Sequence, residues 1–243
     1  MTIMETTRDG DHGQRRVTLP AVLTMSTPVI ESECRQPLLL PARYLDRCRD
    51  AVRSVLFESD ARVVGVTSAA PTPAKATLAA GIATTLAVDT GEPTVLVECD
   101  PERPAYRAML GIPSDEGVVD WLRDETPLHM ARMQALRNAY VIPVGGDGND
   151  VGSTFYQLTQ TPLVQLLRRG FRNVVLNLPP VVSEGHSILA AHLADRILLT
   201  AVAGESKLTD LKRAVALLDP HQVQGVVLTN FESRIPAWLR RLL

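Results

Sequence analysis

A single lysine at the start of an alanine-rich segment is the residue best placed to do chemistry. Lys75 follows a β-branched run of strand length, residues 62–67, and begins the alanine-rich run 75–88. A loop between a buried strand and a helix gathers backbone N–H groups at the positive end of the helix dipole. A lysine in the first helical turn adds a full positive charge there. The arrangement is suited to binding phosphate.

The loop before this lysine departs from the glycine-rich pattern that phosphate binding normally uses. In the Walker A pattern, GxxxxGK followed by Ser or Thr, glycines let the backbone wrap the phosphates and the hydroxyl ligates magnesium. On that template the glycines fall on Ala69 and Ala74, and the hydroxyl residue falls on Ala76. Pro73 also removes one backbone donor. Each charge-assisted bond lost costs about 1–3 kcal/mol. We therefore expect nucleotide binding to be weakened by orders of magnitude.

Glu98 and Asp100 are the acidic side chains best placed to act on a bound phosphate. They lie at the end of a strand-like run, and Asn177 ends another. Since ligands in such sheets bind beyond the carboxyl ends of the strands, we expect these side chains to lie near the lysine. The two acids could hold magnesium or act as a general base, or they could be a solvated loop pair. Asn177 has the shape of an aspartate without its charge, which suits a site without metal, because a buried carboxylate beside no cation is costly.

The candidate nucleotide-binding residues are thus Ala74, Lys75, Ala76, Thr77 and Asn177, and the candidate catalytic residues are Glu98 and Asp100. No metal ligand is put forward, because the five histidines form no HxxxH or HExxH pair and the three cysteines form no CxxC pair. We expect ATP and Mg²⁺ as cofactors only if the altered loop still binds them.

Composition and sequence order exclude several classes of binding partner and several cellular locations. A formal net charge of −2 provides no overall field for nucleic acid, which we do not expect as a partner. The longest apolar runs are far shorter than the roughly 20 residues that cross a bilayer. The first residues lack the basic-then-apolar order of a secretory signal, and isolated cysteines are typical of a reducing compartment. We expect the chain in the cytoplasm, either free or at the inner face of the cell membrane.

Strand-like and helix-like runs alternate from residue 41 onward. The expected strands are 62–67, 94–98, 140–144, 173–177, 196–201 and 224–229. The expected helices are 41–58, 75–88, 106–110, 117–123, 161–169, 187–194 and 208–218. Near-continuous apolar strands separated by amphipathic helices are typical of an α/β fold with a doubly wound, mostly parallel sheet. We expect residues 41–243 to form this domain and residues 1–40, which show no sustained period, to be a mobile arm.

Several segments resemble the cytosolic P-loop domain of the bacterial tyrosine autokinases (BY-kinases) of capsule and exopolysaccharide synthesis. Residues 66–71 match the start of the family's VTSxxPGEGKST loop, and residues 98–104 keep the second acid, the Arg and the Pro of its DxDxRxP segment. Residues 174–180 keep the apolar strand and Pro-Pro of its DxPP segment, with Asn177 in place of the Asp. Residues 193–195 and 225–230 are similar to its closing segments. The resemblance covers roughly residues 42–231.

The resemblance implies a P-loop NTPase fold of the deviant-Walker, MinD/ParA-like type, and a membrane-embedded polysaccharide co-polymerase or chain-length protein as partner. It also implies a homo-oligomer assembled through an ExxRxxR pattern in the entry helix. Asp46 and Arg49 fit the first two places of that pattern, whereas Arg53 lies one residue beyond the third. The terminal tyrosine cluster of the family is missing, because Tyr156 is the last tyrosine.

The segment after residue 233 is amphipathic. Ile235, Trp238, Leu239 and Leu242 fall on one helical side, with three arginines nearby. It could pack on the core, lie on a membrane surface or dock on a partner.

We expect a non-catalytic or weakly catalytic regulator or assembly component of exopolysaccharide synthesis or export. The alternatives are an active, atypical ATPase or tyrosine kinase of the same family, with Glu98 and Asp100 as its acids, and a MinD/ParA-type positioning regulator.

Overall fold

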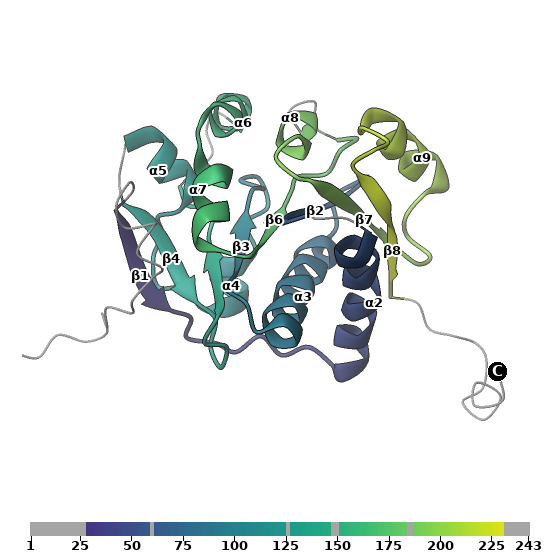
Figure 1. The fold of residues 1–243 in the computed structure, drawn as a ribbon. Coiled ribbons are helices and arrows are strands. Elements are labelled where there is room, and N and C mark those ends of the chain that lie inside the picture. The colour runs from purple at the N-terminus through teal and green to yellow at the C-terminus, as the bar shows by residue number, and fades with distance from the viewer. Residues whose placement is uncertain (1–27, 59–60, 125–126, 147–150, 184–186, 231–243) are drawn as a thin grey trace, which may run out of the picture.

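The computed structural model describes residues 28–58, 61–124, 127–146, 151–183 and 187–230 (Figure 1). Within these residues an eight-stranded sheet has the order β1-β4-β5-β3-β6-β2-β7-β8. The strands are β1 Val29–Glu33, β2 Val63–Ser68, β3 Thr94–Glu98, β4 Leu128–Arg132, β5 Ala139–Ile142, β6 Asn173–Asn177, β7 Arg196–Val202 and β8 Val223–Thr229. All neighbouring strands are parallel except β4 and β5. The predicted α/β fold with a doubly wound, mostly parallel sheet is confirmed.

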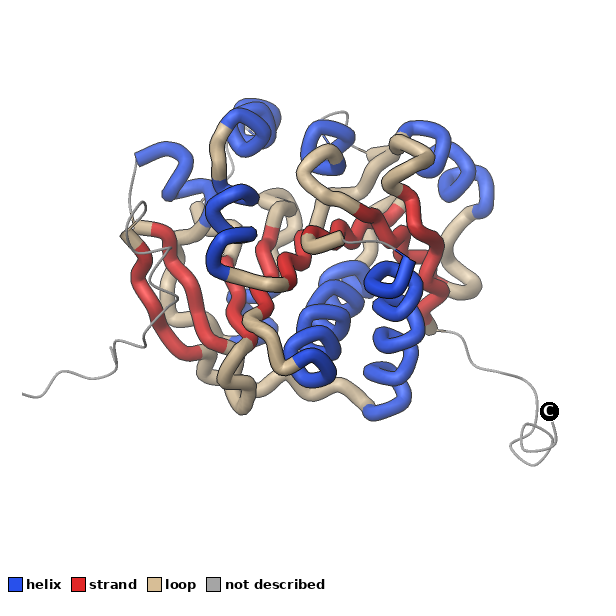
Figure 2. The backbone as a smooth tube through the Cα atoms, in the orientation of Figure 1, coloured by secondary structure: helices blue, strands red, loops and turns tan. Residues whose placement is uncertain are grey.

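Helices cover both faces of the sheet (Figure 2). They are α2 Ala42–Glu58, α3 Pro73–Thr90, α4 Tyr106–Leu110, α5 Val118–Asp124, α6 Val151–Gln160, α7 Leu163–Gly170, α8 Ser187–Ala191 and α9 Leu208–Leu217. One core cluster joins α2, α3 and α4 to one face, and the other joins α5 to α9 to the opposite face. Strands β2, β3, β5 and β6 are buried throughout, which explains their near-continuous apolar sequences.

The alanine-rich helix α3 lies at the centre of one layer, and its small residues let α2 pack closely against it. A Cβ added at Gly81 would lie 2.7 Å from Cys48 Sγ on α2. Thr72 caps the helix by accepting a hydrogen bond from Ala74 N, and the helix ends at Gly91, whose φ of +69° favours glycine. The position of Lys75 in the first helical turn is therefore fixed by both ends of the helix.

Three elements were not expected from the sequence: β1, β4 and α6. Strand β1 lies within the segment expected to be a mobile arm, and it pairs in parallel with β4 at the edge of the sheet. Both strands are short and include charged residues, such as Glu31, Glu33 and Arg132, so neither has the continuous apolar run of a central strand. Residues 28–40 thus contribute to the domain, and residues 1–27 lie outside the described part.

No helix in the described ranges is long and apolar enough to cross a bilayer. The same ranges contain no group of three or more His, Cys, Asp or Glu side chains arranged to hold a metal ion.

Candidate functional site

A cavity of about 330 Å³ lies at the carboxyl ends of β2, β3 and β6, where the sequence places the phosphate loop. Its lining residues are Pro71, Thr72, Pro73, Lys75, Ala76, Asp100, Arg103, Pro104, Ala105 and Asn177. Four predicted site residues are thus brought together: Lys75, Ala76, Asp100 and Asn177. Ala74, Thr77 and Glu98 are not among the lining residues. The Thr77 hydroxyl lies 3.4 Å from the Pro73 carbonyl in its own helix, to which it donates a hydrogen bond.

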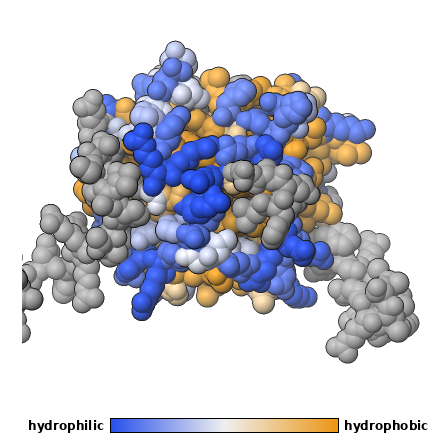
Figure 3. All heavy atoms as spheres, in the orientation of Figure 1, coloured by the Kyte–Doolittle hydropathy of each residue, from blue (hydrophilic) through white to orange (hydrophobic). Residues whose placement is uncertain are grey.

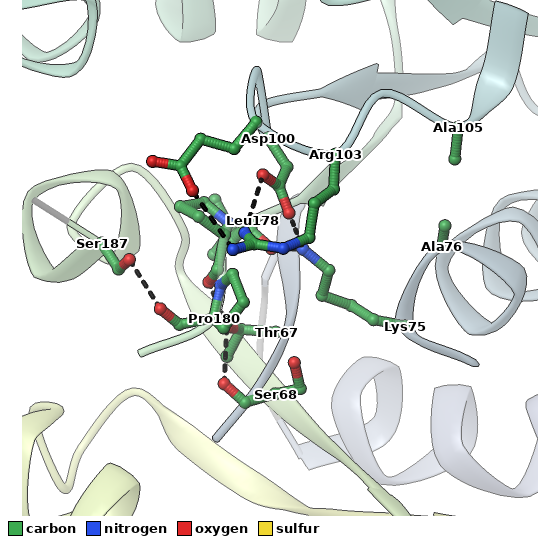
Figure 4. A network of polar contacts seen from close by, with 12 residues as sticks. Thr67, Ser68, Lys75, Ala76, Asp100, Arg103, Ala105, Leu178, Pro180 and Ser187 are labelled. Carbon is green, nitrogen blue, oxygen red and sulfur yellow. Dashed lines mark hydrogen bonds and ion pairs between the residues drawn. The ribbon is translucent and has the colours of Figure 1, made fainter. Parts of the chain in front are cut away.

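The side chain of Lys75 is buried and bonded within the protein (Figure 4). Its Nζ lies 2.6 Å from Asp100 Oδ2 and also donates to the carbonyl oxygen of Leu178. The side chains of Lys75 and Asp100 are only 4% and 1% exposed. A phosphate group could bind the Lys75 ammonium only by displacing the buried Asp100 carboxylate, which already neutralises its charge.

Lys75 belongs to a set of three side chains that fix the backbone of the Pro-Pro segment. Thr67 Oγ1 donates to the Pro179 carbonyl at 2.6 Å, and Ser187 Oγ donates to the Pro180 carbonyl at 2.7 Å. Lys75 Nζ donates to the Leu178 carbonyl. The three successive carbonyls of residues 178–180 thus each accept a hydrogen bond from a different part of the chain. The two prolines have no N–H, so their backbone can form hydrogen bonds only through the carbonyl oxygens that these donors reach. Thr67 and Ser187 were not predicted, although a Pro-Pro pair at a buried strand end signals a need for donors.

The charges around the cavity are balanced. Asp100 Oδ1 lies 3.6 Å from Nη1 of Arg103, and Nη2 of Arg103 lies 3.1 Å from Glu102 Oε2. Two cations therefore face two carboxylates. Arg103 was expected only as a retained motif residue, and the structure places it at the rim of the cavity, 37% exposed.

Glu98 turns its carboxylate toward backbone amides. Its Oε1 accepts from the N–H groups of Ala105 and Tyr106, which begin α4, and its Oε2 accepts from Val144 N. Burial raises the pKa of Glu98, although the three N–H donors favour its charged form. In this geometry Glu98 has a structural role, because its carboxylate fixes the start of α4. The catalytic role predicted for it stays a prediction.

The raised pKa of Glu98 has a testable effect on stability. A carboxyl group whose pKa is higher in the folded than in the unfolded chain contributes stability at low pH and loses it as the pH rises through the folded value. The free energy of unfolding of the wild type, relative to the non-titrating variant Glu98→Gln, should therefore fall as the pH is raised from about 4.5, by about 1.4 kcal/mol for each unit of pKa difference. Urea unfolding of both proteins across pH 4.5–8 measures it. A difference that stays constant or grows with pH would contradict the assignment.

Among the described residues, both side-chain polar atoms of Asn177 are left without a hydrogen bond. The side chain is buried at 1% exposure, and neither Nδ2 nor Oδ1 has a partner there. Its neighbours across the sheet are Val66 and Glu98. The amide is neutral, so it brings no charge to the cavity that it lines.

The donor set of this cavity does not fit a magnesium ion. Mg²⁺ requires near-octahedral oxygen ligands, usually with one or two free carboxylates. Ala76 presents a methyl group where the hydroxyl ligand would stand, and Asn177 presents a neutral amide. Asp100 is held by Lys75 and Arg103, whose charges oppose a further cation.

Two residues of the expected oligomer pattern, Asp46 and Arg49, are bonded within the chain. Arg49 bonds Asp46 on its own helix and Asp89 at the end of α3, each at 2.8 Å. Arg53 is exposed on α2. The amphipathic segment after residue 233 lies outside the described residues.

Comparison with known proteins shows which folds this chain resembles. No protein-family model matches the chain. The succinoglycan biosynthesis transport protein ExoP of Rhizobium meliloti (strain 1021) is 27% identical over 188 residues, which are 74% of this chain and 24% of ExoP. The kinase domain of VpsO superposes with a TM-score of 0.67 at 22% identity and covers 78% of this chain and 97% of that domain. The fold is that of a bacterial tyrosine kinase domain.

Other solved structures agree. The kinase domain of the Escherichia coli tyrosine kinase ETK has a TM-score of 0.64 at 16% identity, covering 77% of this chain and 76% of that one. The cell division protein MinD of Aquifex aeolicus has a TM-score of 0.56 at 19% identity, covering 70% of each chain. The resemblance to BY-kinases and the MinD-like P-loop fold are thus confirmed. The chain spans about a quarter of the length of ExoP, the curated relative that it matches.

Proposed function

We propose that this chain is a degenerate P-loop domain of the BY-kinase type that serves exopolysaccharide synthesis or export without catalysing phosphoryl transfer efficiently. The observation that carries the proposal is the buried bond of Lys75 to Asp100 and to the Leu178 carbonyl, beside Ala76 and Asn177. The family's framework is kept, while its phosphate and magnesium contacts are replaced.

Phosphoryl transfer depends on positioning and on neutralising the charge of the phosphates, with little covalent chemistry by the protein. Lys75 supports the Pro-Pro segment, and its charge is already matched by Asp100. The described residues that line the cavity offer no magnesium ligand set to take over that task. The geometry therefore favours a domain that binds partners or forms assemblies, and it does not favour a domain that hydrolyses ATP.

The polysaccharide context comes from ExoP, whose name describes a transport protein of succinoglycan biosynthesis. We propose that this chain engages the cytosolic end of a membrane-embedded polysaccharide co-polymerase, at the inner face of the cell membrane, and that copies of it assemble there. The ion pairs of Arg49 keep α2 in place on α3, so that its exposed side, with Arg53, is available as a rigid contact face.

The test is direct. Purified protein incubated with ATP and Mg²⁺ should show no tyrosine autophosphorylation and no ATP hydrolysis above the level seen in EDTA. The ETK kinase domain, handled in parallel, is the matched positive control. Magnesium-dependent turnover that Asn177→Ala abolishes in a folded variant would overturn the proposal. Failure to bind the cytosolic segment of a co-polymerase would remove its assembly part alone.

A further inference from the structure

The cavity at the carboxyl ends of β2, β3 and β6 has polar atoms in its wall that the described part of the chain leaves unbonded. Polar side chains are common on the outer surface, where water reaches them (Figure 3). Asn177 differs from these, because it is buried and neither its Nδ2 nor its Oδ1 has a hydrogen-bond partner among the described residues. Its backbone carbonyl, by contrast, accepts a hydrogen bond from Cys99 N at 2.9 Å. A buried amide without partners costs free energy, so a bound group that supplies them is favoured.

The amide of Asn177 lies on the face of the sheet that α3 covers. Side chains alternate along a strand, so Asn177 shares a face with Val175, which packs in the core cluster of α2 and α3. Its neighbour Val66 on β2 belongs to the same cluster. Ala76, in the first turn of α3, lines the cavity together with Asn177 and presents only a methyl group, which cannot bond the amide. The amide therefore faces the cavity and is open to a ligand there.

A second unbonded acceptor belongs to the same wall. Asp100 Oδ2 lies 2.6 Å from Lys75 Nζ, whereas Asp100 Oδ1 has no hydrogen-bond partner among the described residues. The 3.6 Å between Asp100 Oδ1 and Arg103 Nη1 is an ion-pair contact that is too long for a hydrogen bond. The cavity thus offers a ligand one amide donor group and two acceptor oxygens, from Asn177 and Asp100.

The charges of the site favour an uncharged ligand. Lys75 and Arg103 already face the carboxylates of Asp100 and Glu102. An anion would meet the Asp100 carboxylate, and a cation would meet the two basic side chains, so either would be opposed in a buried site. A wholly apolar ligand would leave the Asn177 amide unbonded. The fitting ligand is neutral and carries both donors and acceptors.

The size and the remaining wall of the cavity narrow the class further. Its volume of about 330 Å³ equals that of about ten water molecules, which is room for roughly ten non-hydrogen atoms. Much of the wall is apolar, formed by the rings of Pro71, Pro73 and Pro104 and the methyl groups of Ala76 and Ala105. Figure 4 shows these two alanine side chains turned toward one another. A hydroxyl group both donates and accepts, so neighbouring hydroxyls on a small carbon ring match the polar atoms while the C–H groups pack on the prolines.

We propose that this cavity binds a small, uncharged, polyhydroxylated ligand of the size of a monosaccharide or a cyclic polyol. One hydroxyl donates to Asn177 Oδ1, its neighbour accepts from Asn177 Nδ2, and a further hydroxyl donates to Asp100 Oδ1. The prolines of the wall exclude water from the opposite side of the ring. This inference rests on the proposed function in one respect, because a cavity that held Mg-ATP would not be available to such a ligand.

Titration of the ¹⁵N-labelled full chain with D-glucose, D-galactose and myo-inositol, each followed by NMR, tests the proposal. The side-chain NH₂ signals of Asn177, identified by their loss in Asn177→Leu, should shift saturably with at least one of the three, together with the backbone amide of Ala105. In Asn177→Leu the affinity, followed at Ala105, should fall about tenfold or more, because two hydrogen bonds are lost. Circular dichroism melting should show this variant folded, since the amide has no bond among the described residues to lose.

Thr77→Val is the matched control. Thr77 follows Ala76 on α3 but does not line the cavity, and its hydroxyl bonds the Pro73 carbonyl of its own helix. The affinity of this variant for the ligand that binds the wild type should be unchanged within about twofold, since no hydrogen bond to the ligand is lost.

Four outcomes would overturn the inference. The absence of any shift of the Asn177 NH₂ signals with the three compounds would show that water alone serves the amide. Equal affinity in the wild type and Asn177→Leu would place the ligand elsewhere. A shift with acetamide alone would assign the cavity to an amide, and a shift with inorganic phosphate alone would assign it to an anion. None of these outcomes affects the proposed function, which is overturned separately by magnesium-dependent ATP hydrolysis, whatever the titrations with the three compounds give.

Discussion

Lys75→Met should lower the free energy of unfolding by about 3–5 kcal/mol, the cost of leaving one partner of a buried ion pair alone. The Asp100 side chain, 1% exposed, would retain only Arg103 at 3.6 Å, and the Leu178 carbonyl would lose its donor. A lysine that served only to bind phosphate would affect ligand affinity and leave the apo fold almost unchanged. Urea unfolding followed by circular dichroism at pH 7 measures the loss.

Two variants make this prediction specific. Lys212→Met removes an exposed lysine of α9 and should change stability by less than about 0.5 kcal/mol. Lys75→Met/Asp100→Asn should recover part of the loss, because the buried charge is removed with its partner. The structural role assigned to Lys75 is wrong if Lys75→Met and Lys212→Met have the same free energy of unfolding.

Restoring the replaced residues should produce magnesium-dependent nucleotide binding. In Ala74→Gly/Ala76→Ser/Asn177→Asp the loop regains backbone freedom, a hydroxyl ligand and a carboxylate beside the cavity. Each regained charge-assisted bond contributes about 1.5–3 kcal/mol, so the affinity for Mg-ATP should rise by about 100-fold or more. Calorimetric titration with ATP in Mg²⁺, and separately in EDTA, measures the gain.

The gain must depend on the metal. The matched control is the same triple variant with Asn177→Ala in place of Asn177→Asp, which restores the loop without the carboxylate. It should bind Mg-ATP much more weakly than the aspartate variant. The aspartate variant should also be less stable in EDTA than in Mg²⁺, since its buried carboxylate then faces no cation. Equal binding in EDTA and Mg²⁺ would show that the missing ligands are not what limits this site.

The sequence predicted the central part of the fold because its signals are strong there. Strands β2, β3 and β6 are buried on both faces and therefore carry continuous apolar runs, and Lys75, Asp100 and Asn177 meet in one cavity at the carboxyl ends of these strands. Strands β1 and β4, the edge strand and its neighbour, were missed because both are short and carry charges such as Glu31 and Arg132, so their pattern does not differ from that of a loop.

The direction of the site's side chains could not be predicted. Lys75 and Asp100 are 25 residues apart, and their bond depends on the path of the loop after β3. Glu98 was placed among acids that could act on phosphate, yet its orientation depends on where α4 begins, seven residues later. Residue types and spacing define which groups meet at a sheet edge, whereas the partner each group takes is decided by loop conformation.

The bond between Lys75 and the Leu178 carbonyl changes how a retained lysine in an altered Walker A loop should be interpreted. Under the proposed function, a residue that holds the Pro-Pro segment in place stays under selection for folding after its ligand is lost, because its replacement should destabilise the domain. Drift can then remove the glycines and hydroxyls around it while the lysine persists. In surveys of related genomes, the lysine of a decayed loop is therefore a poor marker of enzymatic competence, and the residue at the end of β6, Asn177 here, is the better one to compare.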